Sequence, residues 1–78
     1  MKMIALEDVF NIAEILGNQI GEYLVARLAA DIRRLVEENN NQPISEGRLR
    51  SWLVEQGLAT QEVADNLVIF ADDSLPFI

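Results

Sequence analysis

Adjacent acidic residues are the side chains in this sequence that come nearest to a catalytic pair. They occur at Glu7-Asp8, Glu37-Glu38 and Asp72-Asp73. Acid–base catalysis by two carboxyl groups requires that they face each other across a cleft with separated pKa values. Residues that are adjacent on an exposed helix or turn do not meet this requirement. We therefore interpret the paired acids as solvated surface.

The residue types that usually supply nucleophiles and metal ligands are scarce. The sequence has no histidine and no cysteine, and Lys2 is its single lysine. It therefore offers no imidazole as a general base or metal ligand, and no thiolate nucleophile. The serines have no histidine or lysine partner, and there is no glycine-rich loop of the kind that binds phosphate groups. We expect no enzymatic activity, no cofactor and no metal site.

Charge and length narrow the remaining functions. Thirteen acidic residues outnumber six basic ones in a chain of 78 residues, which gives a formal net charge of −7. This charge is spread along the sequence, and it repels the phosphate backbone of DNA while attracting basic protein surfaces. The length suits one small domain over residues 1–78. We expect a protein partner with a basic surface, and nucleic acid is an unfavourable partner.

Apolar residues are more abundant than a small domain easily buries. Ile, Leu, Val, Met, Phe, Trp and Tyr make up 31 of the 78 residues. We interpret the surplus as an interface, most simply in a homodimer, although small domains always expose some apolar surface. No apolar run is as long as a membrane span, and the first residues lack a signal-peptide pattern. We therefore expect a cytoplasmic protein without membrane contact.

Two amphipathic helices are predicted in the first half of the chain. Residues 6–16 place their apolar side chains, including Leu6 and Phe10, on one arc. Residues 19–38 carry a second apolar stripe that is rotated relative to the first, which favours a break or sharp kink at 17–21. In that interpretation Gly17 is the left-handed residue that ends the first helix. The second stripe is the candidate dimer interface and consists of Leu24, Leu28, Ile32 and Leu35.

The spacing Gly17-x-x-x-Gly21 has a second interpretation, because small residues four positions apart allow two helices to approach closely. This signal is weak in a protein without membrane spans.

Two further helices follow a polar loop. Ser45 is placed to cap residues 46–56, Gly57 to end that helix in a Schellman motif, and Thr60 to cap a helix over 61–71. Alternatively, 67–70 form a strand that turns back into a C-terminal β-hairpin. The elements predict an all-α domain of four helices, in which a helical hairpin precedes a helix-turn-helix-like half, with a hairpin or extended tail as the alternative ending.

The outline of the C-terminal half matches a helix-turn-helix unit, whose second helix reads DNA with basic and amide side chains. Here that helix carries Glu62 and Asp65 and no basic residue. Contacts to phosphates would therefore depend on Arg48 and Arg50 in the preceding helix. A helical hairpin without a DNA-binding role is the better interpretation.

The last residues are unusually apolar for a chain terminus, which is normally polar. The segment Leu75-Pro76-Phe77-Ile78 either folds over the core or docks on a partner as a short linear peptide. Phe10 and Tyr23 are additional candidate apolar anchors. The candidate partner-binding residues are Trp52, Asp72, Asp73, Leu75, Phe77 and Ile78.

These features predict a small, acidic, non-enzymatic protein-binding module that regulates or inhibits another macromolecule. Antitoxins, immunity proteins, anti-activators and inhibitors encoded by mobile elements share this composition, which is an analogy only. One alternative is a dimeric helix-turn-helix DNA-binding regulator, which a salt-dependent gel shift would reveal. Another is a structural subunit of a larger assembly, which would form large oligomers as its concentration rises.

Overall fold

The computed structural model describes residues 3–70 and is mostly helical, which confirms the predicted all-α class. Two short 3₁₀ helices precede the two longer α-helices. The elements, in chain order, are β1 (Met3–Ile4), η1 (Leu6–Asp8), α1 (Val9–Ile20), η2 (Glu22–Leu24), α2 (Val25–Glu38), β2 (Ile44–Ser45), α3 (Glu46–Glu55) and α4 (Gln61–Asn66).

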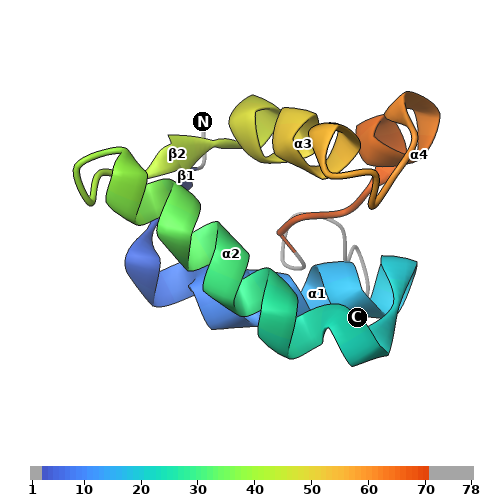
Figure 1. Cartoon of the computed structure of the whole chain (residues 1–78), viewed down its shortest axis with the longest axis horizontal. Helices are drawn as coiled ribbons and strands as arrows, with labels where there is room; N and C mark the ends of the chain where they lie inside the picture. The colour runs from blue at the N-terminus through green and yellow to red at the C-terminus, as the bar shows by residue number, and fades with distance from the viewer. Residues whose placement is uncertain (1–2, 71–78) are drawn as a thin grey trace, which may run out of the picture.

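The helices form two layers (Figure 1). α1 and α2 make a helical hairpin, and α3 and α4 lie together across from it. An extended segment, 67–70, runs from the end of α4 back between the two layers. Within residues 3–70 no helix combines the length and apolar character that a membrane span needs.

A two-stranded sheet joins the N-terminal segment to the start of α3, and the sequence did not predict it. β1 and β2 are antiparallel, with Met3 opposite Ser45 and Ile4 opposite Ile44. Both isoleucines are buried. The sheet therefore places one apolar side chain from each strand in the core and ties the first helical layer to the second.

One cluster of buried apolar side chains lies between the layers, and it draws on both strands, on α1, α2 and α3, and on the segment 67–70. Its largest fully buried side chains are Ile4, Ile12, Leu16, Leu28, Ile32, Val36, Leu49 and Leu53.

The chain breaks between α1 and α2 as predicted, but at a different glycine. α1 continues through Gly17 to Ile20, and the break falls at Gly21, whose φ of 150° is unfavourable for residues with a side chain. Gly17 is buried inside the helix, and a Cβ atom added there would overlap the Cγ2 methyl of Val25. The prediction of Gly17 as the residue that ends the helix is therefore wrong. Its role is to let α1 and the start of α2 approach closely.

We expect Gly17→Ala to lower the free energy of unfolding by about 1 kcal/mol, because the overlap with Val25 outweighs the helix propensity of alanine. In a Val25→Ala background, where the methyl group is absent, the same change is expected to stabilise the protein by up to about 1 kcal/mol. Urea unfolding of the four members of this double-mutant cycle measures both effects. An equal destabilisation in both backgrounds would contradict the proposed contact.

The predicted caps of α3 and α4 are confirmed. The Ser45 hydroxyl accepts a hydrogen bond from the Arg48 backbone N–H at 3.1 Å, and the Thr60 hydroxyl accepts one from Val63 at 3.2 Å. At the end of α3 the N–H groups of Gly57 and Leu58 donate to the carbonyls of Val54 and Leu53. These two bonds, with Gly57 at a φ of 74°, form the expected Schellman motif.

The fourth helix is shorter than predicted. α4 ends at Asn66, and Leu67 already has extended backbone angles, so the expected helix over 61–71 is wrong for residues 67–70, and residue 71 lies outside the described residues. Residues 67–70 are extended but do not belong to the sheet that the structure describes. Leu67 and Ile69 are buried while Val68 is exposed, which is the alternation of an extended chain with one buried face. The predicted hairpin turn and its return strand lie outside the described residues.

Two polar side chains fix this extended segment. The Gln19 amide accepts a hydrogen bond from the Val68 backbone N–H at 2.9 Å and donates one to the Val68 carbonyl at 2.7 Å. It thereby satisfies the backbone of Val68 as a neighbouring strand would. Arg50 donates to the carbonyls of Ala64 and Leu67 from the opposite layer. The end of the described chain is therefore anchored to both helical layers.

Candidate interaction surface

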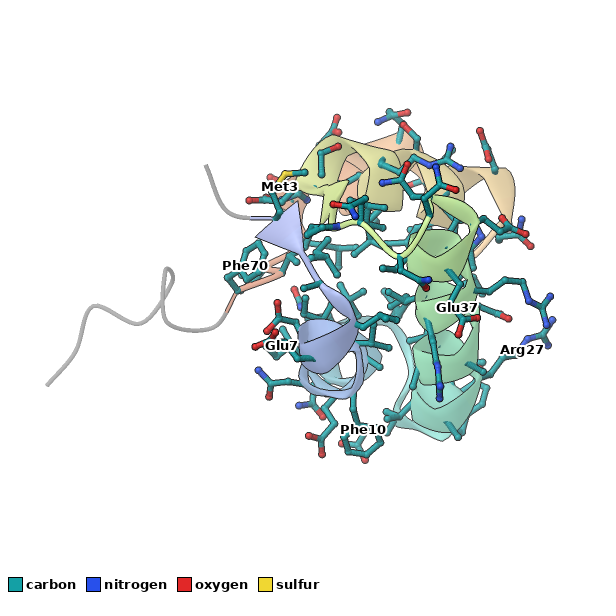
Figure 2. The ribbon with its side chains drawn as sticks, turned by 90° about the vertical axis from the view of Figure 1, so that its left-hand side faces the viewer. Met3, Glu7, Phe10, Arg27, Glu37 and Phe70 are labelled. Atoms are coloured by element: carbon teal, nitrogen blue, oxygen red, sulfur yellow. The ribbon has the colours of Figure 1, made fainter. Side chains whose placement is uncertain are left out.

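Phe10 is the prominent exposed aromatic side chain of α1. It is 61% exposed and lies one helical turn from Leu6, which is 40% exposed. Figure 2 shows Phe10 pointing away from the body of the protein, on the side remote from α3. The helical wheel placed both residues on one apolar arc with Val9, Ile12 and Leu16, and the structure buries those three while it leaves Leu6 and Phe10 exposed.

A groove runs beside these two side chains, between α1 and α2. Its volume is about 430 Å³. Alanine side chains on α2 leave this space open, because a larger residue at position 29 or 30 would fill it. We call this surface the α1 groove, and define it by Leu6, Glu7, Phe10, Ala29, Ala30 and Arg33.

The side of the groove that α1 forms is acidic. Residues 3–26 carry four carboxylates and no basic side chain, whereas the arginines of the described chain all lie between positions 27 and 50. Glu7 and Glu14 are three residues before and four residues after Phe10, so they flank it on the same face of the helix. Arg33 lines the groove, but its Nε lies 3.3 Å from the Glu37 carboxylate, which balances its charge. The phenyl ring is therefore bordered by unbalanced negative charge.

A second groove, of about 420 Å³, lies between α2 and α3 and is polar. Three arginines and three acids line it, so its formal charges cancel. One of these pairs is Arg27 with Asp31, at 3.7 Å. In Figure 2 Arg27 extends from the side of α2 that faces away from α1. This groove lacks the apolar surface that the α1 groove has.

Trp52, a predicted partner-binding residue, belongs to this polar groove. It is half-buried and packs against the core, so only part of the indole is accessible. Tyr23, by contrast, is 87% exposed on η2. The other predicted partner-binding residues, Asp72, Asp73, Leu75, Phe77 and Ile78, lie outside the described residues.

The predicted dimer stripe occupies the core of a single chain. Leu28 is 1% exposed, Ile32 0% and Leu35 7%, and Leu24 is half-buried against the same core. These side chains belong to the same buried cluster as side chains of α1, α3 and the segment 67–70 of their own chain. A dimer that used this stripe would first have to open the core.

The structure also places the two arginines on which DNA contact would depend. Arg50 is half-buried, donates to the carbonyls of Ala64 and Leu67, and its Nη2 lies 3.2 Å from Glu46. It is therefore engaged in holding α3 to the end of α4. Arg48 is exposed, and α4 has six residues, none of them basic. Of the two arginines in the helix-turn-helix-like half, Arg48 is therefore the accessible one.

The α1 groove was missed by sequence reasoning because its shape depends on two helices. Its sequence signal is Ala29-Ala30, two small residues in succession on α2. These two alanines line the groove with Phe10 and leave it open. The spacing alone does not show which part of α1 the alanines face.

No group of three or more acidic residues within residues 3–70 is arranged to bind a metal ion. Comparisons of the chain with protein-family models, with curated proteins and with solved structures gave no match.

Proposed function

We propose that this chain is a non-enzymatic protein-binding module that regulates or inhibits another protein by contacting it through the α1 groove. The observation that carries the proposal is the exposed phenyl ring of Phe10, which stands beside an open groove and between two carboxylates. Aromatic side chains supply much of the binding energy at protein interfaces when they enter a desolvated contact.

The distribution of charge supports a protein partner with a basic surface. The formal net charge of −7 steers such a partner toward the chain, and Glu7 and Glu14 place part of that charge beside Phe10. The same carboxylates repel nucleic acid phosphates. Apolar contact at Phe10 would supply the affinity, and the acids would favour basic partners over acidic ones.

The test compares Phe10→Ser with a matched control, Val63→Ser, which changes another exposed apolar side chain on the distant helix α4. Each protein is immobilised and exposed to a lysate of the cells that produce it, and bound proteins are eluted with increasing salt. We expect one protein to be retained by the wild type and by Val63→Ser, to elute with salt, and to be lost from Phe10→Ser. Equal retention by all three proteins would contradict the proposed surface.

A further inference from the structure

We propose that the occupant of the α1 groove is a basic amphipathic helix that inserts one large apolar side chain between Phe10 and the alanines of α2. This inference rests on the proposed function and specifies the chemistry of its partner. The structure supplies three arguments, from the shape of the groove, from the backbone of its walls and from the charges at its rim.

The shape fits a side chain that projects from a helix. Ala29 and Ala30 form one wall and Phe10 with Leu6 the other, so a partner side chain would meet apolar atoms on both sides. The volume of about 430 Å³ exceeds that of a single side chain, which leaves room for part of the partner's helical surface. Contacts of this kind occur where an amphipathic helix lies in a groove and its apolar residues recur at helical spacing.

The backbone of the walls favours a helical partner over an extended one. The groove is formed by α1, α2 and η1, whose backbone groups are paired within helices, and its apolar lining has no exposed strand edge. An extended peptide would leave its own N–H and carbonyl groups without partners against Leu6, Phe10 and the alanines. A helix satisfies those groups internally.

The charges favour a basic partner over a second copy of this chain. Glu7 and Glu14 flank Phe10, and the charge of Arg33 is balanced by Glu37. A symmetric dimer through this face would bring the same carboxylates of both copies together, which is repulsive. Lysine or arginine residues along the sides of a partner helix would instead meet Glu7 and Glu14.

The experiment uses the full chain and a fluorescein-labelled 18-residue synthetic helix of lysine and leucine, with the leucines on one face, and measures binding by fluorescence anisotropy. Ala30→Leu fills the groove without changing any charge. Ala26→Leu is the matched control, because it adds the same side chain to an exposed position one turn away that does not line the groove. Circular dichroism verifies that both variants fold.

We expect the basic helix to bind the wild type and Ala26→Leu with similar affinity and Ala30→Leu at least about tenfold more weakly, with affinity falling as salt rises. A version of the peptide with glutamate in place of lysine should not bind. Equal binding to Ala30→Leu and the wild type, binding of the glutamate peptide, or no binding of the basic helix would each overturn the proposal. So would dimerisation of the protein alone that Ala30→Leu abolishes, because the occupant would then be a second copy.

These outcomes are distinguishable from failure of the proposed function. If Phe10→Ser loses a partner from the lysate while the basic helix does not bind, the α1 groove remains a binding surface and only the chemistry of its partner is wrong. If the lysate partner is retained by Phe10→Ser, the proposed function itself fails, whatever the peptide does.

Discussion

Leu28→Ala is expected to lower the free energy of unfolding by about 2–5 kcal/mol, the cost of removing a large side chain from a closed core. Leu28 is 1% exposed and lies near the start of α2, in the buried cluster of its own chain. For a domain of this size such a loss is a large fraction of the total stability. Urea unfolding followed by circular dichroism measures it, and Ile32→Val, with an expected loss of about 0.5–1.5 kcal/mol, is a milder variant if Leu28→Ala does not fold.

The dependence on protein concentration decides between a core residue and a dimer interface. Because the contacts of Leu28 are within one chain, we expect the urea midpoints of the wild type and of the variant to be the same at low and high protein concentration. Leu24→Ala is the control on the same stripe. It should lower the free energy of unfolding by less than Leu28→Ala does, because Leu24 is half-buried. Urea midpoints that rise with protein concentration in the wild type but not in Leu28→Ala would indicate that this stripe is a subunit interface.

Arg50→Met is expected to lower the free energy of unfolding by about 2–3 kcal/mol, although it replaces a surface charge with an apolar side chain of similar length. The guanidinium of Arg50 donates to the carbonyls of Ala64 and Leu67 and also contacts Glu46. Loss of charged hydrogen bonds to partly buried carbonyl groups leaves those groups without a donor. The end of α4 and the segment 67–70 would lose their attachment to α3.

Arg48→Met is the matched control, because Arg48 is also on α3 but its side chain is exposed. The free energy of unfolding of Arg48→Met should be within about 0.5 kcal/mol of the wild-type value. Hydrogen exchange provides a second measurement: the amide of Leu67 should exchange faster in Arg50→Met and at the wild-type rate in Arg48→Met. Equal effects of the two substitutions on stability and on exchange would show that Arg50 does not anchor the segment.

The parts of the fold that depend on neighbouring residues could be predicted from the sequence. The caps at Ser45 and Thr60 and the turn at Gly57 each involve bonds that span three to five residues, so their residue types are sufficient signals. The break near residues 17–21 was also predictable, because two apolar stripes with different phases cannot share one straight helix with one partner.

The parts that depend on distant residues could not be predicted. The strands β1 and β2 have two residues each, too few to show an alternating pattern. Gln19 and Val68 are separated by 49 positions, and their pairing supports the extended alternative for residues 67–70 over the preferred helix. The helical wheel likewise identified the face of α2 correctly as apolar but had no information on what covers it. Leu28 and Ile32 therefore resembled a free interface.

Photo-crosslinking from position 10 tests the central claim, that the α1 groove binds a protein partner, most directly. The phenylalanine analogue p-benzoyl-phenylalanine is placed at Phe10 or, as a control, at Trp52 in the polar groove, and each protein is irradiated in its cells. We predict a crosslinked product from position 10 whose second component is a different protein with a basic helix, and no such product from position 52. A partner crosslinked from position 52 and not from position 10 would contradict the account. So would a product from position 10 that contains only a second copy of the chain.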